Sequence, residues 1–128
     1  MNKEPVIILP SHQRESGFAL SAIGTSFIIR EWRGSGPPYL HVHYEDDEAW
    51  HILEGTLTFK FRDRLMDAGA GTTVFVPAGT PHTYFEKSSS RYLVILTSRL
   101  DQLIAELHKA PIGEHRAIMK KYKSEILE

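Results

Sequence analysis

The sequence predicts an all-β fold, an antiparallel sandwich or barrel, followed by a short helical tail. Three observations support this. Short apolar and β-branched segments recur from residue 6 to residue 98, and clusters of Gly, Pro and Ser separate them. After Ser98 the apolar spacing changes from a period of two to a helical period. We therefore expect one domain over residues 1–128, with the barrel at about 5–98 and the tail at about 99–128.

The composition is that of an ordinary globular domain. The chain has 128 residues, of which 41% are apolar, and its net charge is −1. A charge so near zero gives no reason to expect nucleic acid or a membrane as a partner. There is no cysteine, which excludes disulfides and thiolate sites. The apolar run at 6–9 is too short for a signal peptide, so a cytoplasmic protein is expected.

The expected strands alternate with turns along the first three quarters of the chain. Residues 56–61 illustrate the pattern, because Leu57, Phe59 and Phe61 would share one face of a strand. By the same reasoning, strands are expected at 6–9, 25–32, 39–43, 49–53, 56–61, 72–76, 82–86 and 91–98.

Helical spacing begins with the tail. Leu100, Leu103, Ile104 and Leu107 recur at i, i+3, i+4 and i+7, with Ser98 as the expected N-cap. We expect this stripe to pack on the barrel wall or on a partner subunit, in preference to forming part of a binding site. Pro111 and Gly113 interrupt the helix, and a second helix is expected at about 114–122.

Histidines form the first candidate site. His41 and His43 would project from the same face of a strand, with Cα atoms about 6.5–7 Å apart. Two imidazoles so placed can converge on one ion at about 2.0–2.1 Å. The acidic run at 45–48 is either a solvated turn or the source of an anionic ligand. His82 follows the stiff turn "PAGTP" and is either a surface histidine or a third ligand.

Taken together, these residues resemble the cupin family. Its first motif is a glycine, five residues, His-x-His, three or four residues, Glu, six residues, Gly. His41, His43, Glu48 and Gly55 match it, whereas Asp47 would leave seven residues before Gly55. Glu48 is therefore the acid that the resemblance selects.

The second motif is a glycine, five residues, Pro-x-Gly, two residues, His, three residues, Asn. Gly71, Pro77, Gly79 and His82 match it in register, and Glu86 stands where the family has Asn. In the first motif the upstream glycine is one place off. The motif has five residues between this glycine and the histidine pair, whereas four residues separate Gly36 from His41 and six separate Gly34 from it.

The resemblance implies a small double-sheet jelly-roll barrel that binds a divalent transition metal (Fe, Mn, Ni or Zn) through His41, His43, Glu48 and His82. Zinc would be closed by four ligands, whereas an octahedral ion would keep open positions. Glu48 is also the candidate catalytic base. Among cupins, the chain is similar to small single-domain proteins of the quercetin dioxygenase-like group, and a homodimer is expected on the same ground.

A substrate pocket can be sketched from strand parity. Tyr39 shares the face of the histidine pair, Trp50 and Ile52 that of Glu48, and Tyr84 that of His82. Ordinary core packing is the alternative for each of them. His51 has the opposite parity and is not expected to be a ligand. The remaining histidines are expected at the surface or in packing contacts: His12, His108 and His115.

Two functions remain open from the sequence. One is a metal-dependent dioxygenase, an oxidoreductase acting on a small aromatic or enol-type molecule. The other is a non-catalytic module that binds a metal or small ligand, as a sensor or carrier. A sugar isomerase or epimerase is a third reading. It would need cationic side chains in the cavity, for which Arg30 and Lys60 are the candidates.

Overall fold

The computed structural model describes residues 4–14 and 20–128. These residues form ten strands, all paired antiparallel, and two α-helices, which confirms the predicted fold class. The strands are β1 (Ser21–Ile23), β2 (Ile28–Arg33), β3 (His41–His43), β4 (Glu48–Glu54), β5 (Thr56–Lys60), β6 (Leu65–Gly69), β7 (Thr73–Val76), β8 (Thr83–Glu86), β9 (Arg91–Leu96) and β10 (Ser124–Ile126). The helices are α1 (Ser98–Lys109) and α2 (His115–Lys121), with 3₁₀ turns η1 (Ser11–Gln13) and η2 (Ile112–Glu114).

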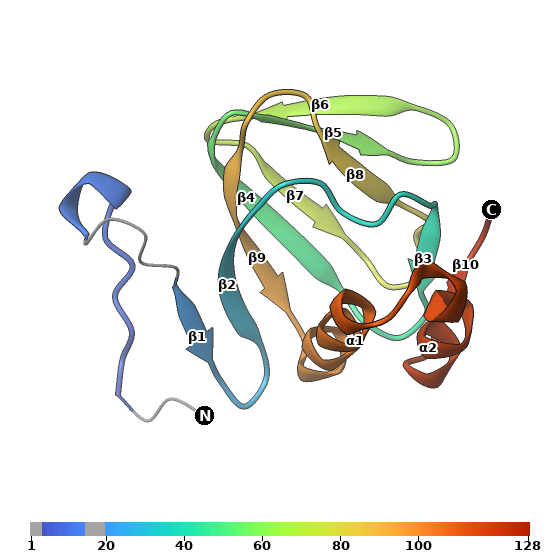
Figure 1. The fold of residues 1–128 in the computed structure, drawn as a ribbon. Coiled ribbons are helices and arrows are strands. Elements are labelled where there is room, and N and C mark those ends of the chain that lie inside the picture. Colours follow the sequence, from blue (N-terminus) through green and yellow to red (C-terminus); the bar gives the residue numbers. More distant parts are fainter. Residues whose placement is uncertain (1–3, 15–19) are drawn as a thin grey trace.

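The strands group into three hydrogen-bonded sheets. A five-stranded sheet has the order β1-β2-β9-β4-β7, a three-stranded sheet has the order β6-β5-β8, and β3 pairs with β10. Figure 1 shows the two larger sheets on either side of the barrel, with β3, β10 and both helices gathered at one end. A single bridge between His41 and His82 joins β3 to the residue that precedes β8. This bridge brings the two candidate motifs together.

The core lies between the sheets because alternate side chains point inward. Trp50 and Ile52 on β4, Leu57 and Phe59 on β5, and Val94 on β9 are at most 1% exposed. Burial of each large apolar side chain contributes about 1.5–3 kcal/mol. The intervening β4 residues are only partly buried, which is the period-2 pattern of a strand with one inward face.

Two glycines lie where two segments of the chain approach each other closely. Gly55 ends β4 with φ +73°, and a Cβ there would lie 2.0 Å from the Ser89 carbonyl oxygen. Gly36 packs against the Tyr84 ring, where a Cβ would lie 2.5 Å from a ring carbon. A larger residue would require a backbone shift at Gly55 and a displaced Tyr84 ring at Gly36. The displaced upstream glycine of the first motif therefore has a local packing role.

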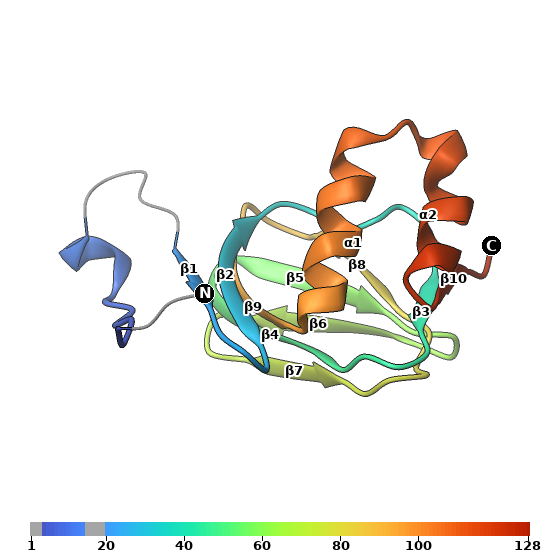
Figure 2. The same cartoon turned by 90° about the horizontal axis from the view of Figure 1, so that it is seen from below.

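The tail folds back onto the barrel. Leu100, Leu103 and Leu107 of α1 are buried, as the helical spacing predicted. The expected cap at Ser98 is wrong by one residue. Thr97 has an extended backbone and its side chain accepts a hydrogen bond from the Leu100 amide, so Ser98 is already helical. Figure 2 shows α1 and α2 together along one side of the strands, with β3 and β10 beside α2.

Several strand predictions need correction. The segment at 6–9 forms no strand, because Pro5 and Pro10 flank it without amide hydrogens and no neighbouring strand pairs with it. β1, β6 and β10 were not predicted, since each is short and lacks a clear apolar alternation. Predicted ends differed by one to three residues, since 25–32 begins three residues before β2, 91–98 ends two residues after β9, and 49–53 falls one residue short of β4 at each end. Within the described residues, the helices are all too short and too polar to cross a bilayer.

Candidate metal centre

Backbone pairing places His41 and His82 side by side. The His41 amide donates to the His82 carbonyl (3.1 Å), and the His82 amide donates to the His41 carbonyl (2.8 Å). Residues that exchange both hydrogen bonds lie directly opposite each other in an antiparallel pair, with side chains on one face. The two imidazole centroids are accordingly 4.5 Å apart. Two residues that are 41 positions apart in sequence thus become neighbours.

The other two candidate ligands complete the cluster. His43 lies two residues after His41 on the same face, and its carbonyl accepts from the Gly79 amide in the second motif's turn (2.7 Å). Ligand nitrogens of the three histidines all lie within 4.8 Å of one another. Glu48 Oε1 lies 3.5 Å from His43 Nε2 and 3.2 Å from His82 Nε2. All four side chains are buried, with exposures of 6% or less.

A hydrogen-bond acceptor lies beside Nδ1 of each imidazole. His41 Nδ1 faces the Tyr39 carbonyl oxygen (3.2 Å), and His82 Nδ1 faces the Thr80 carbonyl oxygen (2.9 Å). His43 Nδ1 faces the hydroxyl of Ser124 (2.8 Å). Carbonyl oxygens only accept, so the proton sits on Nδ1 of His41 and His82. Nε2 of both histidines is therefore available for an ion, and in His82 this nitrogen lies beside Glu48.

The donor set fits a cation. Both nitrogens of His82 face acceptor oxygens, one from Thr80 and one from Glu48. A neutral imidazole has only one N–H, so the contact with Glu48 needs a second proton or a metal ion between the two atoms. Ligands about 2.0–2.2 Å from one ion stand about 2.8–3.6 Å apart at right-angled or tetrahedral geometry, and the 3.2 and 3.5 Å found here lie in that range.

Burial and the neighbouring groups place two of the residues in their metal-binding protonation states. Burial, with His82 and His43 close by, lowers the pKa of His41 to about 3, so its imidazole is neutral. Burial alone would raise the pKa of Glu48, but the close approach of His43 and His82 outweighs burial and brings it down to about 2. The carboxyl is therefore ionised. A neutral imidazole and an anionic carboxylate are the forms that bind metal.

The acidic run divides into separate roles. Asp46 is buried and accepts from the Thr97 hydroxyl (2.9 Å), which ties this loop to the start of α1. Asp47 is exposed and accepts from the Ala78 amide (2.8 Å). Glu45 is exposed. Glu48 alone of the four contacts the histidines, as the motif spacing favoured.

A cavity of about 370 Å³ opens onto the cluster. Tyr39, Trp50 and Tyr84 line it, as strand parity predicted, but Ile52 does not. Ile52 does share the inner face of β4. It lies two residues further along than Trp50, is fully buried, and pairs with Tyr92 in the core. The cavity is bordered by Tyr92 but not by Ile52.

The tail supplies a cavity wall that the sequence reasoning missed. Leu103 and Leu107 of α1 line the cavity together with His115 and Met119. His115 Nε2–H donates to the Leu107 and Ala110 carbonyls (both 3.1 Å), so its Nδ1 accepts from the Tyr39 hydroxyl (2.8 Å). The helical stripe predicted a buried face but carried no signal that this face borders a site.

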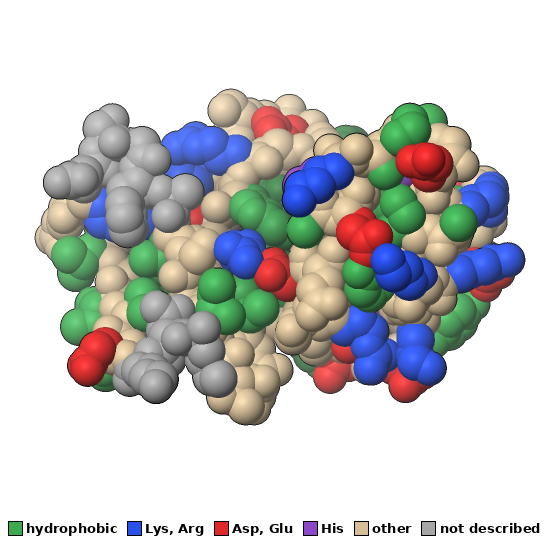
Figure 3. Space-filling model, turned by 60° about the horizontal axis from the view of Figure 1, so that its bottom comes forward, with side chains coloured by type: hydrophobic (Ala, Val, Ile, Leu, Met, Phe, Trp, Pro, Cys, Tyr) green, Lys and Arg blue, Asp and Glu red, His purple; other side chains and the backbone are tan. Residues whose placement is uncertain are grey.

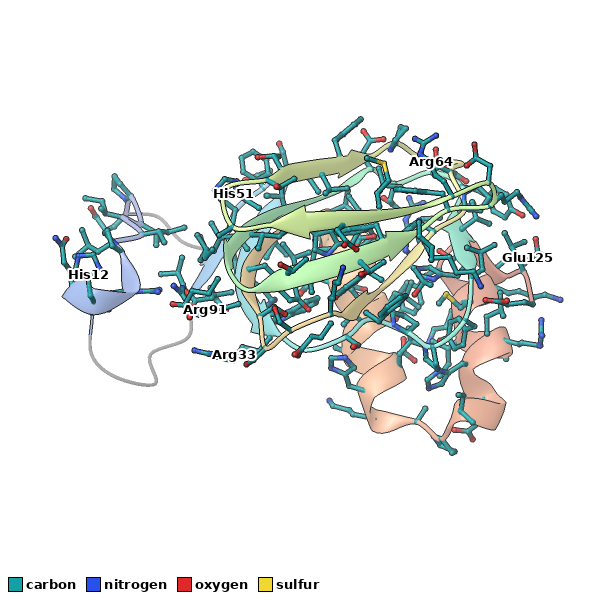
Figure 4. All side chains as sticks on the ribbon, turned by 90° about the horizontal axis from the view of Figure 1, so that it is seen from above. His12, Arg33, His51, Arg64, Arg91 and Glu125 are labelled. Atoms are coloured by element: carbon teal, nitrogen blue, oxygen red, sulfur yellow. The ribbon has the colours of Figure 1, made fainter. Side chains whose placement is uncertain are left out.

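The other histidines are further from the cluster. His108 is exposed, contacts the Trp32 ring and lines the cavity. Figure 4 shows His12 on the N-terminal segment, outside the barrel, and His51 at the barrel edge. The His51 ring pairs with the Thr73 hydroxyl (2.9 Å), which agrees with its opposite parity.

Charged side chains are sparse around the cavity. Arg30 is paired with Asp101 (2.8 Å) and Lys60 lies 3.6 Å from Glu128, and neither lines the cavity. Among its described lining residues, the formally charged ones are Glu48 and Arg33, and Arg33 is exposed. On the face shown in Figure 3, basic and acidic side chains are interspersed, with no broad patch of one sign.

Comparison with known proteins adds a family match. Residues 29–97, just over half of the chain, match the family described as "Cupin domain". This segment contains all four candidate ligands and ends just before α1. A search of curated proteins found no match to this chain.

Solved structures share the fold. A cupin-2 domain protein from Shewanella frigidimarina is 24% identical with a TM-score of 0.56, covering 68% of this chain and 86% of that one. A Neisseria meningitidis protein is 20% identical with a TM-score of 0.57, covering 73% and 100%. The polyketide cyclase RemF from Streptomyces resistomycificus is 25% identical with a TM-score of 0.50, covering 58% and 56%.

Proposed function

This chain belongs to the cupin domain family, and we propose that it is a metal-dependent dioxygenase of a small aromatic or enol-type substrate. The proposed ligands are His41, His43, Glu48 and His82. One observation carries the proposal: three imidazoles and a carboxylate converge, fully buried, at the end of an aromatic cavity. Cupins commonly bind a divalent metal, and this donor set suits one.

The metal would supply the reactive chemistry. A six-coordinate ion such as iron, manganese or nickel, held by four protein ligands, has Lewis acidity and two further coordination positions. Zinc with the same four ligands would be coordinatively closed, which disfavours it for this reaction.

The cavity walls favour a planar, largely uncharged molecule. Tyr39, Trp50 and Tyr84 offer aromatic surfaces, and Leu103 and Leu107 close the opposite side. Among the described lining residues the formally cationic one, Arg33, is exposed, so a phosphate deep in the cavity would find no buried counter-charge from the protein. This disfavours a sugar-phosphate isomerase. An enolate or phenolate oxygen would instead be drawn toward a metal ion held by the four proposed ligands.

Glu48 has two proposed roles that compete. Its pKa of about 2 makes it a good anionic ligand but a weak proton acceptor at neutral pH. It could accept a substrate hydroxyl proton at Oε1 only after moving away from His43 and His82. We therefore favour the ligand role, with the base role confined to a state in which the carboxylate has moved.

The test combines metal analysis with oxygen uptake. Protein purified without added metal should contain one equivalent of iron, manganese or nickel, and so should the His51→Ala control. The His41→Ala variant should contain none. The native protein should consume oxygen with members of a panel of flavonols and enols.

Other outcomes would redirect the proposal. Tightly bound metal without oxygen uptake would support the alternative, a non-catalytic binding module, or a reaction without oxygen such as the cyclisation named for RemF. Equal metal in His41→Ala would contradict the ligand assignment. The homodimer, the cytoplasmic location and the single-domain division at about residue 98 stay predictions, which sedimentation, cell fractionation and limited proteolysis would test.

A further inference from the structure

His43 differs from the other two histidines in what holds its Nδ1 proton. His41 and His82 face backbone carbonyl oxygens, which can only accept. The partner of His43 is the Ser124 hydroxyl, which can donate or accept. The orientation of that hydroxyl therefore acts together with Glu48, whose Oε1 lies 3.5 Å from Nε2, in setting which nitrogen of His43 carries the proton.

A second hydrogen bond fixes the orientation of the Ser124 hydroxyl. Ser124 Oγ donates to the Tyr122 carbonyl oxygen (3.1 Å), which leaves its lone pairs to accept from His43 Nδ1–H (2.8 Å). Both side chains are buried, with exposures of 3% and 4%, so water does not compete. The chain of bonds runs in one direction, from the imidazole to the hydroxyl to the backbone. Nε2 of His43 is then the nitrogen with a free lone pair, 3.5 Å from Glu48.

Backbone pairing fixes the place of Ser124. Ser124 is the register partner of His43 in the β10–β3 pair, and the Tyr44 amide donates to the Lys123 carbonyl (3.0 Å). Lys123 has φ +57°, the turn that redirects the chain from α2 into β10. Arg116 of α2 donates to the Ile126 carbonyl (3.3 Å). The tail thus holds the hydroxyl at a set distance from the imidazole.

We propose that Ser124 is a positioning residue of the metal centre, which keeps His43 in its Nδ1–H tautomer with Nε2 directed at the ion. This inference rests on the proposed metal site. It adds a residue that lies 27 positions beyond the end of the family match at residue 97. Such outer partners orient metal-bound histidines, and their loss costs about tenfold to hundredfold in metal affinity.

The experiment compares Ser124→Ala with Ser90→Ala. Ser90 is equally buried, at 2% exposure, and has no contact with the histidines, so it controls for loss of a buried hydroxyl. Zn²⁺ affinity is measured by chelator competition, with ¹⁵N-histidine NMR of the metal-free protein at pH 8 to read the tautomer. We expect Ser124→Ala to bind Zn²⁺ about tenfold to hundredfold more weakly. Its His43 should become a mixture of tautomers, while Ser90→Ala matches the native protein.

The outcomes separate the two proposals. Unchanged affinity and an unchanged tautomer in Ser124→Ala would overturn the role of Ser124. If the native protein bound no Zn²⁺, the metal site would fail, and the tautomer of metal-free His43 would still decide whether Ser124 orients it. If Ser124→Ala did not fold, Ser124→Thr and Ser124→Val would replace it. These two have similar volume and differ in the hydroxyl, so only Thr should keep the native tautomer.

Discussion

The four candidate metal ligands lie on β3, on β4 and just before β8, whereas the tail that follows β9 contacts the residues around them. Barrel strands place His41 and His82 opposite each other by backbone pairing. The tail acts through side chains, with Ser124 on His43 and His115 on Tyr39. The barrel supplies the candidate donor atoms, whereas the tail orients the side chains around them and forms one wall of the cavity.

This difference shows that the candidate site, with the cavity beside it, extends beyond the segment that matches the family. The match covers residues 29–97 and includes all four candidate ligands. Residues of α1 and α2, which lie outside the matched segment, form one wall of the cavity beside these ligands. A barrel of this kind can therefore keep its ligand set while the tail determines the shape of the cavity. The following changes test how independent the two regions are.

Leu103→Ala should have the largest effect, through the tail. Leu103 is fully buried between α1 and the barrel. Its truncation should reduce the free energy of unfolding by about 2–5 kcal/mol, because a cavity remains where the side chain was. Urea unfolding of the metal-free protein measures this, with the exposed Gln102→Ala as the control. A loss below about 1 kcal/mol would mean that the barrel does not depend on its tail.

Glu48→Gln should act on the barrel side with little effect on folding. The amide keeps the shape of the side chain but removes the negative charge beside His43 and His82. We expect metal affinity to fall by at least about hundredfold, more than the range for outer partners of metal ligands, because a direct anionic ligand becomes neutral. The free energy of unfolding of the metal-free protein should change little, since a neutral amide costs less to bury than the carboxylate, which offsets the weaker contacts with His43 and His82.

Asp47→Asn is the matched control for that change. Asp47 is the acid that the motif spacing rejected, and it is bonded to the Ala78 amide. Metal affinity measured by chelator competition should stay within about twofold of native, as expected for an exposed charge outside the cluster. A larger loss in Asp47→Asn than in Glu48→Gln would reverse the choice between the two acids.

Tyr39→Phe should have the smallest effect. It removes the hydroxyl that donates to His115 but keeps the Tyr39 carbonyl that accepts from His41. We expect the free energy of unfolding to fall by about 1 kcal/mol, the net value of one hydrogen bond, with metal affinity unchanged. Thermal and urea unfolding test this against Tyr44→Phe, whose exposed hydroxyl pairs with Glu125. A large loss of metal affinity would show that His115 acts on the ligands through Tyr39.

Local patterns were sufficient for the parts of the molecule that repeat with a period. The alternation at 56–61 located β5, and the spacing of Leu100, Leu103 and Leu107 located α1. Motif spacing distinguished Glu48 from Asp47. β10 was missed because three residues are too few to show an alternation, and its pairing depends on a strand 81 positions earlier. Ile52 shares the predicted face but does not line the cavity, because parity assigns a face and not the residues on that face that border a cavity.

By itself, the sequence determined the antiparallel fold class, the family resemblance and the inward parity of the four candidate ligands. These follow from residue spacing, since strand geometry repeats every two residues. Tertiary structure alone decided that the tail walls the cavity and that Ser124 holds the Nδ1 proton of His43. Such contacts join residues far apart in the chain, and their geometry depends on how helices and strands pack, which no local pattern encodes.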